Sequence, residues 1–168
     1  MKKYQCLLLD ANVVIELFSL GLWDAIVKQC EIHLSEIVIQ EASYYPDASG
    51  NLCPINLDSY LNQGSVHRFS RSTTDLLNFK NRFGPNYFEK LDPGETESLL
   101  HLVSGSCEDY HICSSDAIVF RVLAHLSRSH QGVSLEELLD QFSIRQNLQK
   151  KYTRAFRLEW CQRGLAGL

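Results

Sequence analysis

The sequence predicts an α/β fold, a three-layer α/β/α sandwich built on a central, mostly parallel sheet. Short apolar runs that suit buried strands alternate along the chain with segments of helical periodicity, and this alternation is typical of such sheets. The chain of 168 residues has the length of one domain, and its 45% hydrophobic and 21% charged content is that of a globular protein. We therefore expect a single domain over residues 1–168.

The first half of the chain contains three predicted strands and three predicted helices. Short apolar runs indicate strands at residues 6–9, 31–34 and 65–69, and apolar periodicity indicates helices at 12–27, 36–43 and 73–83. Gly21 interrupts the first helix, and Ser35 stands where it can cap the second. Residues 45–64 hold prolines and glycines, so we expect a loop or an inserted hairpin there.

The second half opens with a strong helix start. Asp92-Pro93-Gly94-Glu95 combines a capping residue, a proline in the first turn and an acid three residues after the cap. A strand at 110–113 follows, and Ser115 or Asp116 can begin the next helix.

A basic helix is predicted at about residues 146–162. Four large side chains recur there every fourth residue, on one stripe: Leu148, Tyr152, Phe156 and Trp160. The stripe can pack on the domain's own core, and the basic face can contact RNA phosphates or a partner protein.

Charge is distributed unevenly around a net value of −4. Residues 92–140 carry a net charge of −7, and residues 141–168 carry +5. A pI near 5.8 argues against a protein that coats nucleic acid generally, but an acidic centre with a basic rim would suit a metal-dependent nuclease. Solvated helix faces are the alternative interpretation.

Four acids stand at or near junctions where a predicted strand gives way to a helix: Asp10, Glu41, Glu95 and Asp116. The carboxyl ends of parallel strands meet at one edge of a sheet, where ligands bind. Carboxylates gathered there would repel one another, and Mg²⁺ or Mn²⁺, which prefer oxygen ligands, would relieve that repulsion. Each acid also has a structural interpretation, as a helix cap for Asp10 and Asp116, a capping-box acid for Glu95 and a solvated helix residue for Glu41.

Four segments together resemble the PIN-domain ribonucleases. They are Leu7-Leu8-Leu9-Asp10-Ala11-Asn12, Ser35-Glu36-Ile37-Val38-Ile39-Gln40-Glu41, Leu91-Asp92-Pro93-Gly94-Glu95 and His111-Ile112-Cys113-Ser114-Ser115-Asp116. In order and spacing they are similar to the family's apolar strand followed by Asp, its acidic helix positions and its strand followed by a hydroxyl residue and Asp. The resemblance covers roughly residues 5–130, and it implies a PIN-like domain.

The resemblance implies a metal-dependent endoribonuclease that hydrolyses RNA phosphodiesters. Asp10, Glu41, Glu95 and Asp116 would then bind one or two Mg²⁺ or Mn²⁺ ions. Asn12 and Ser115 would orient those carboxylates or a metal-bound water, and Asp92 and Glu97 compete with Glu95 for its place.

Partners are also implied by the resemblance. Many short members are toxins held inactive by an antitoxin protein, and members commonly form homodimers. The alternative is a catalytically inactive PIN-like module that binds RNA or protein.

Other site classes lack support in the sequence. The six cysteines form no CxxC pair, so we do not expect a structural zinc site at His111, Cys113 and Cys107. The remaining histidines show no HExxH spacing and are expected to be ordinary, and P-loop, dinucleotide and nucleophile-elbow motifs do not occur. No apolar run approaches the roughly 20 residues of a membrane span, so we expect a reduced, cytoplasmic protein.

Overall fold

A parallel sheet forms the centre of the protein. The structure is a computed structural model that describes residues 4–85, 90–105 and 109–166, without the side chain of Gln5, so Cys107 lies outside the described residues. Five strands pair in the order β5-β2-β1-β6-β7, and every pairing in the described residues of this sheet is parallel. The strands are β1 (Tyr4–Leu9), β2 (Cys30–Ser35), β5 (Val66–Phe69), β6 (Tyr110–Cys113) and β7 (Gly132–Val133). The predicted α/β fold is confirmed.

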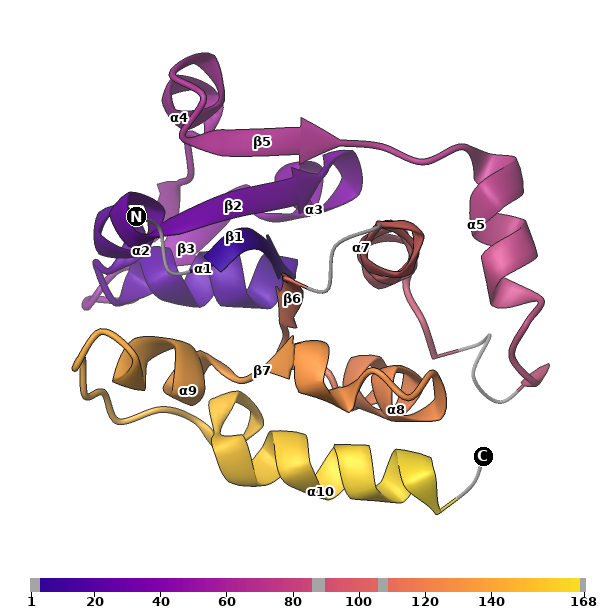
Figure 1. Ribbon diagram of the computed structural model, residues 1–168. Helices are drawn as coiled ribbons and strands as arrows, with labels where there is room; N and C mark the ends of the chain where they lie inside the picture. Colours follow the sequence, from indigo (N-terminus) through magenta and orange to yellow (C-terminus); the bar gives the residue numbers. More distant parts are fainter. Residues whose placement is uncertain (1–3, 86–89, 106–108, 167–168) are drawn as a thin grey trace.

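Helices cover both faces of the sheet (Figure 1). They are α1 (Ala11–Ser19), α2 (Trp23–Gln29), α3 (Glu36–Glu41), α4 (Asp58–Asn62), α5 (Thr73–Lys80), α7 (Pro93–Ser104), α8 (Ala117–His125), α9 (Leu135–Asp140) and α10 (Arg154–Leu165). Within the described ranges, none of these helices has the length and apolar content needed to cross a membrane.

Alternation along β1 divides the core into two layers. Leu7 and Leu9 join the cluster beneath α1, α2 and α9, whereas Cys6 and Leu8 join the cluster beneath α5, α7 and α8. Successive strand residues point to opposite faces, and because β1 is central both faces of it are buried. Burial on two sides explains the continuous apolar run that predicted this strand.

The segment 45–64 contains a hairpin, one of the two forms expected. Strands β3 (Tyr44–Pro46) and β4 (Leu52–Pro54) pair antiparallel. Their turn is held by Asp47, whose Oδ1 accepts hydrogen bonds from the N–H groups of Ser49 (2.8 Å) and Asn51 (2.9 Å). The short helix α4 that follows was not predicted, since its five residues are too few to show a period.

The tail differs from the predicted helix at 146–162. The helix begins at Arg154, because Thr153 caps it through a hydrogen bond from the Phe156 N–H (3.2 Å). Leu148 and Tyr152 lie before that start and pack into the α1 side of the core, whereas Phe156 packs into the α8 side. The four-residue recurrence therefore does not mark one helical stripe, and β7 and α9 were not predicted.

Helix α10 packs along α8, in agreement with the core-packing alternative for the tail (Figure 1). All three of its basic side chains pair with acids of the same chain, and Arg154 Nε lies 3.6 Å from Glu137 Oε1. Arg157 donates two hydrogen bonds of 2.6 Å to the Glu137 carboxylate, and Arg163 donates one of 2.7 Å to Glu159. These pairs direct much of the positive charge of the tail toward the protein itself.

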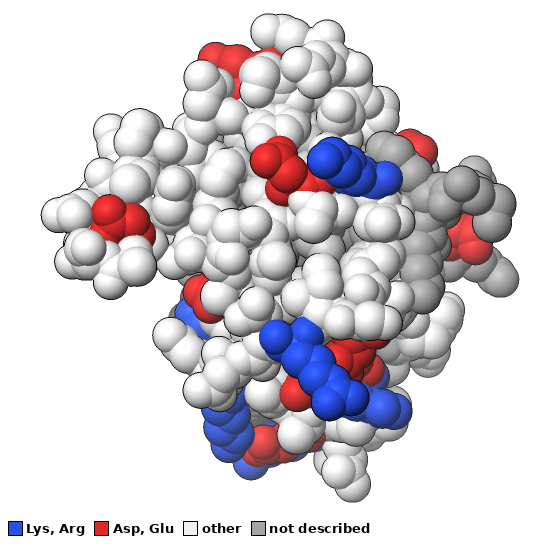
Figure 2. Space-filling model, turned by 90° about the vertical axis from the view of Figure 1, so that its left-hand side faces the viewer, with Lys and Arg blue, Asp and Glu red and all other residues white. Residues whose placement is uncertain are grey.

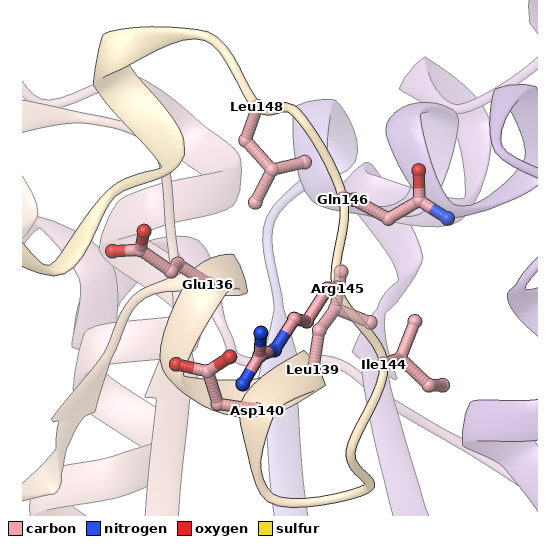
Figure 3. A pocket seen from close by; sticks show the side chains of 7 residues that line it. All are labelled: Glu136, Leu139, Asp140, Ile144, Arg145, Gln146 and Leu148. Carbon is pink, nitrogen blue, oxygen red and sulfur yellow. The ribbon is translucent and has the colours of Figure 1, made fainter.

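The link between α9 and α10 encloses a hollow of about 230 Å³ (Figure 3). Figure 3 shows Arg145 extending toward Asp140, while Glu136 lies on another side of the same hollow. Figure 2 shows the side of the molecule where β2 and β5 begin, and there acidic and basic side chains stand close together in small groups. The described basic side chains in this view form no continuous field that would suit a polyanion.

Candidate active site

A hollow of about 220 Å³ lies beyond the carboxyl end of β1. The chain passes from β1 to β2 and β5 on one side and then returns to β6 and β7 on the other, so the strand order reverses between β1 and β6. A crevice at such a reversal is the usual ligand position in an open parallel sheet. The acids that line the hollow are Asp10, Glu41, Asp92 and Glu95.

Asp10 follows β1 directly and is 7% exposed. Its Oδ1 accepts a hydrogen bond from the Val13 N–H (2.7 Å) and so caps α1. Its Oδ2 accepts from the Ser114 hydroxyl (2.6 Å) and the Ser115 N–H (2.8 Å). Two carboxylate oxygens offer about four acceptor positions, so these three bonds leave one for a ligand in the hollow.

Glu95 and Asp92 form the predicted capping box at the start of α7. Glu95 N–H donates to Asp92 Oδ1 (2.8 Å), and Asp92 N–H donates to Glu95 Oε2 (3.2 Å). Both side chains nevertheless line the hollow, so the structural and the functional interpretations hold for the same residues. Glu95 is 7% exposed, whereas Asp92 is exposed.

Glu41 ends α3 and reaches the hollow across the first turn of α7. A Cβ at Gly94 would lie 3.2 Å from Glu41 Oε2 and 3.5 Å from Asp92 Oδ1. Glycine at this position therefore lets the carboxylate of Glu41 approach the start of α7 closely.

Asp116 caps α8 by accepting a hydrogen bond from the Ile118 N–H (2.9 Å). Its own N–H donates to Ser114 Oγ (3.0 Å), and the same hydroxyl donates to Asp10. Ser114 thus joins the two acids that end β1 and β6. The prediction named Ser115, which reaches Asp10 through its backbone N–H; two adjacent serines after a strand do not reveal which hydroxyl points back.

The other predicted residues fall in different places. Asn12 lines the hollow, and its side chain is exposed. The backbone carbonyl of Asn12 accepts a hydrogen bond from the Tyr152 hydroxyl (3.3 Å). Glu97 does not line the hollow, because its Oε1 accepts from the Arg71 N–H (2.6 Å). Two residues on a helix differ by about 200° in direction, so Glu95 and Glu97 face apart.

The pKa values of three of these acids are raised, which shows that burial and mutual repulsion disfavour their charged forms. Burial, then repulsion by Asp116 and Asp92, raises the pKa of Glu95 to about 9. Burial also raises the pKa of Asp10, against the opposing hydrogen bonds that its carboxylate accepts. The pKa of Glu41 is raised by partial burial and by the charges of Asp92 and Asp10. A bound cation would favour the ionised form of all three.

Asp116 does not line the acidic hollow; it lines a second hollow, of about 300 Å³. Lys90, Arg121 and Trp160 line it together with Asp116. Sequence reasoning assigned Trp160 to helix packing and missed this grouping, since the three residues are far apart in the chain. Asp116 therefore lies in the hollow with the basic side chains, and Ser114 joins it to Asp10 of the acidic hollow.

Comparison with protein-family models finds no match, and no curated protein sequence is significantly similar to the chain. The interpretation of the acidic hollow therefore depends on its own geometry and chemistry.

Proposed function

We propose that this protein is a Mg²⁺- or Mn²⁺-dependent endoribonuclease of the PIN-like kind, with Asp10, Glu41, Glu95 and Asp116 at its centre. One observation carries the proposal. Carboxylates from three separate segments of the chain line one hollow at the reversal point of a parallel sheet, and the pKa of Asp10, Glu41 and Glu95 is raised, that of Glu95 in part by the charge of Asp116.

The chemistry of the donor set fits a hard divalent cation. All of the acidic groups offer carboxylate oxygens, which Mg²⁺ and Mn²⁺ prefer over nitrogen or sulfur. Bound there, such an ion would supply charge neutralisation at the phosphate and activation of a water molecule.

The protein's own groups would fix the geometry of this site. Asp10 is held by three hydrogen bonds from Val13, Ser114 and Ser115, so its remaining acceptor position has a fixed direction. The Ser114 hydroxyl that donates to Asp10 also accepts a hydrogen bond from the Asp116 N–H, so it holds Asp116 near Asp10. Because a reacting group must be positioned to within a fraction of an ångström, this network is what we expect of a catalytic carboxylate.

The second hollow supports a polyanionic substrate. Lys90 and Arg121 line it and can contact phosphates, and Arg163, whose guanidinium lies 4.5 Å from the centre of the Trp160 ring, adds a third cation nearby. A single RNA strand that crosses Asp116 would place one phosphodiester at the acids and its neighbour at the cations.

The proposal extends to a partner. By the resemblance stated above, the chain would act as a toxin that an antitoxin protein neutralises, and a homodimer is part of the same expectation. Induced expression of the chain should arrest growth, and Asp10→Asn should abolish that arrest.

The direct test is cleavage of a structured RNA by the purified chain with Mn²⁺ or Mg²⁺. Asp10→Asn and Asp116→Asn should each lower the cleavage rate by at least about 100-fold, the scale of losing one electrostatic group at a reacting centre. Asp140→Asn is the matched control, since Asp140 is exposed at the end of α9 and lies outside the acidic hollow. Cleavage that survives both test variants would contradict the proposal. RNA binding without cleavage would favour the inactive module.

A further inference from the structure

Two histidines and a glutamate come together on the sheet, away from the acidic hollow. His33 Nε2 lies 3.0 Å from Glu31 Oε1, and His67 Nε2 lies 4.0 Å from the same oxygen. One donor atom from each of the three residues lies within 4.8 Å of the others. The sequence showed no spacing that would group them.

The backbone explains why these side chains meet. Glu31 and His33 are two residues apart on β2, so they point to the same face. His33 and His67 are direct partners in the parallel register of β2 and β5. The three residues therefore stand on two hydrogen-bonded strands. Strands hold side chains in more precisely fixed positions than a loop does.

The spacing suits one tetrahedral metal ion. Zn²⁺ binds imidazole nitrogen at about 2.0–2.1 Å, so its donors lie roughly 3.3 Å apart and two bound imidazole rings have centres roughly 5 Å apart. The observed rings of His33 and His67 have centres 4.8 Å apart. Small side-chain rotations would bring the three donors to equal spacing.

We infer that Glu31, His33 and His67 form a second metal site, which takes Zn²⁺ or a similar transition-metal ion. Imidazole nitrogen with one carboxylate is a donor set for such ions, whereas Mg²⁺ prefers oxygen throughout. The side chains are 40%, 19% and 44% exposed in the order Glu31, His33 and His67, so an ion can enter from solvent. Three protein ligands would leave the fourth position open.

A neighbouring trio, Cys6, His33 and His101, shares one histidine with this site. It is the weaker candidate, because Arg71 Nη2 lies 2.9 Å from His101 Nδ1 and its guanidinium charge repels a cation. Cys6 is also only 2% exposed. The two trios make different spectroscopic predictions, since only one contains sulfur.

Titration of the chelator-treated full chain with Co²⁺ tests the inference. Four-coordinate Co²⁺ absorbs visible light strongly, whereas six-coordinate Co²⁺ bound to oxygens absorbs weakly. We expect a strong visible band in the wild type that Zn²⁺ abolishes by competition. His67→Gln and Glu31→Gln should each weaken Co²⁺ binding by at least about 100-fold, since loss of an outer hydrogen-bond partner alone costs about 10–100-fold.

Two controls separate this site from others. His130→Gln makes the same chemical change at an exposed histidine outside the trio and should leave the band unchanged. Asp10→Asn should also leave it unchanged, even where it abolishes RNA cleavage, so the two metal proposals fail independently. Zn²⁺ should raise the melting temperature of the wild type but not that of His67→Gln, because the ion joins edge strand β5 to β2.

Three results would overturn the inference. They are absence of a strong visible band in the wild type, a band unchanged in folded His67→Gln, and a near-ultraviolet thiolate band, which would place the ion at Cys6. Circular dichroism of each variant checks its fold.

Discussion

Ser114 shows how one hydroxyl can order two acids. It donates to Asp10 Oδ2 (2.6 Å) and accepts from the Asp116 N–H (3.0 Å), and its side chain is fully buried. Removing the hydroxyl leaves a buried carboxylate with one donor fewer and an N–H without its acceptor. Asp10 and Asp116 would then no longer be held at a fixed distance and orientation by a shared hydroxyl.

Ser114→Ala should therefore weaken Mn²⁺ binding by about 10–100-fold, the usual cost of losing a hydrogen bond to a ligand. Ser115→Ala is the matched control, because Ser115 reaches Asp10 through a backbone N–H that the substitution retains. Calorimetric titration of both variants with Mn²⁺ measures the difference. Equal affinities would contradict the role given to Ser114.

Glu95 gives the apo protein a characteristic pH dependence. Folding raises the pKa of its carboxyl group from the ordinary value of 4.5 to about 9, so the folded chain holds a proton between these values that the unfolded chain releases. Stability that depends on this proton is present at low pH and is lost as the pH rises through that window.

Between about pH 6 and pH 8, the wild type should lose about 2–3 kcal/mol more unfolding free energy than Glu95→Gln. Glutamine keeps the capping box but does not ionise. Urea unfolding with a chelator present measures this, and Mg²⁺ should reduce the loss. Parallel pH curves for the two proteins would refute the assignment.

The packing of α10 on α8 depends on a close approach at Gly164. A Cβ there would lie 2.6 Å from the Arg121 carbonyl oxygen and 2.9 Å from Ala124 Cβ. Backbone atoms cannot move aside as the end of a flexible side chain can, so the helices must separate to accept it.

Gly164→Ala should destabilise the protein by about 1–3 kcal/mol. Gly84→Ala is the control, since a Cβ at Gly84 meets no atom within 4 Å and should change stability by less than about 0.5 kcal/mol. Thermal unfolding of the two variants measures both changes in stability. A neutral Gly164→Ala would mean that α10 is not seated as closely as described.

Elements with a clear period or cap were predictable from the sequence. The buried run of β1 and the capping box of α7 are confirmed, because both signals are local. The start of α10 was not predicted, since its large side chains recur every fourth residue across the Thr153 cap and divide between two core layers. Strand β7 has two residues, too few to show alternation.

At the level of the whole molecule, the grouping of the acids was predictable and the grouping of the cations was not. Parallel strands bring their carboxyl ends together, so Asp10 and Asp116 could be expected at one edge of the sheet. Lys90, Arg121 and Trp160 meet only because α10 folds back on α8. The proximity of His33 and His67 was not predicted either, because it depends on the register between β2 and β5.

Lys90→Ala should weaken RNA binding and lower the slope of log affinity against log salt by about one unit, as expected for one lost phosphate contact. Lys28→Ala is the control, because Lys28 is exposed on α2 and lies outside both hollows. Binding of a short single-stranded RNA with Ca²⁺ in place of Mg²⁺ can be followed by fluorescence anisotropy. If Lys90→Ala and the wild type have the same slope of log affinity against log salt, the RNA strand does not pass Lys90.

Three of the clustered acids, Asp10, Asp92 and Asp116, are also the caps of α1, α7 and α8. The partial positive charges at the starts of α1 and α7 therefore lie at the acidic hollow and offset part of the repulsion among its acids. Asp10, Asp92 and Glu95 are held in place by hydrogen bonds within the chain. If the proposed metal ion binds there, a chelator should remove it without unfolding the protein, and readdition of the ion should restore binding.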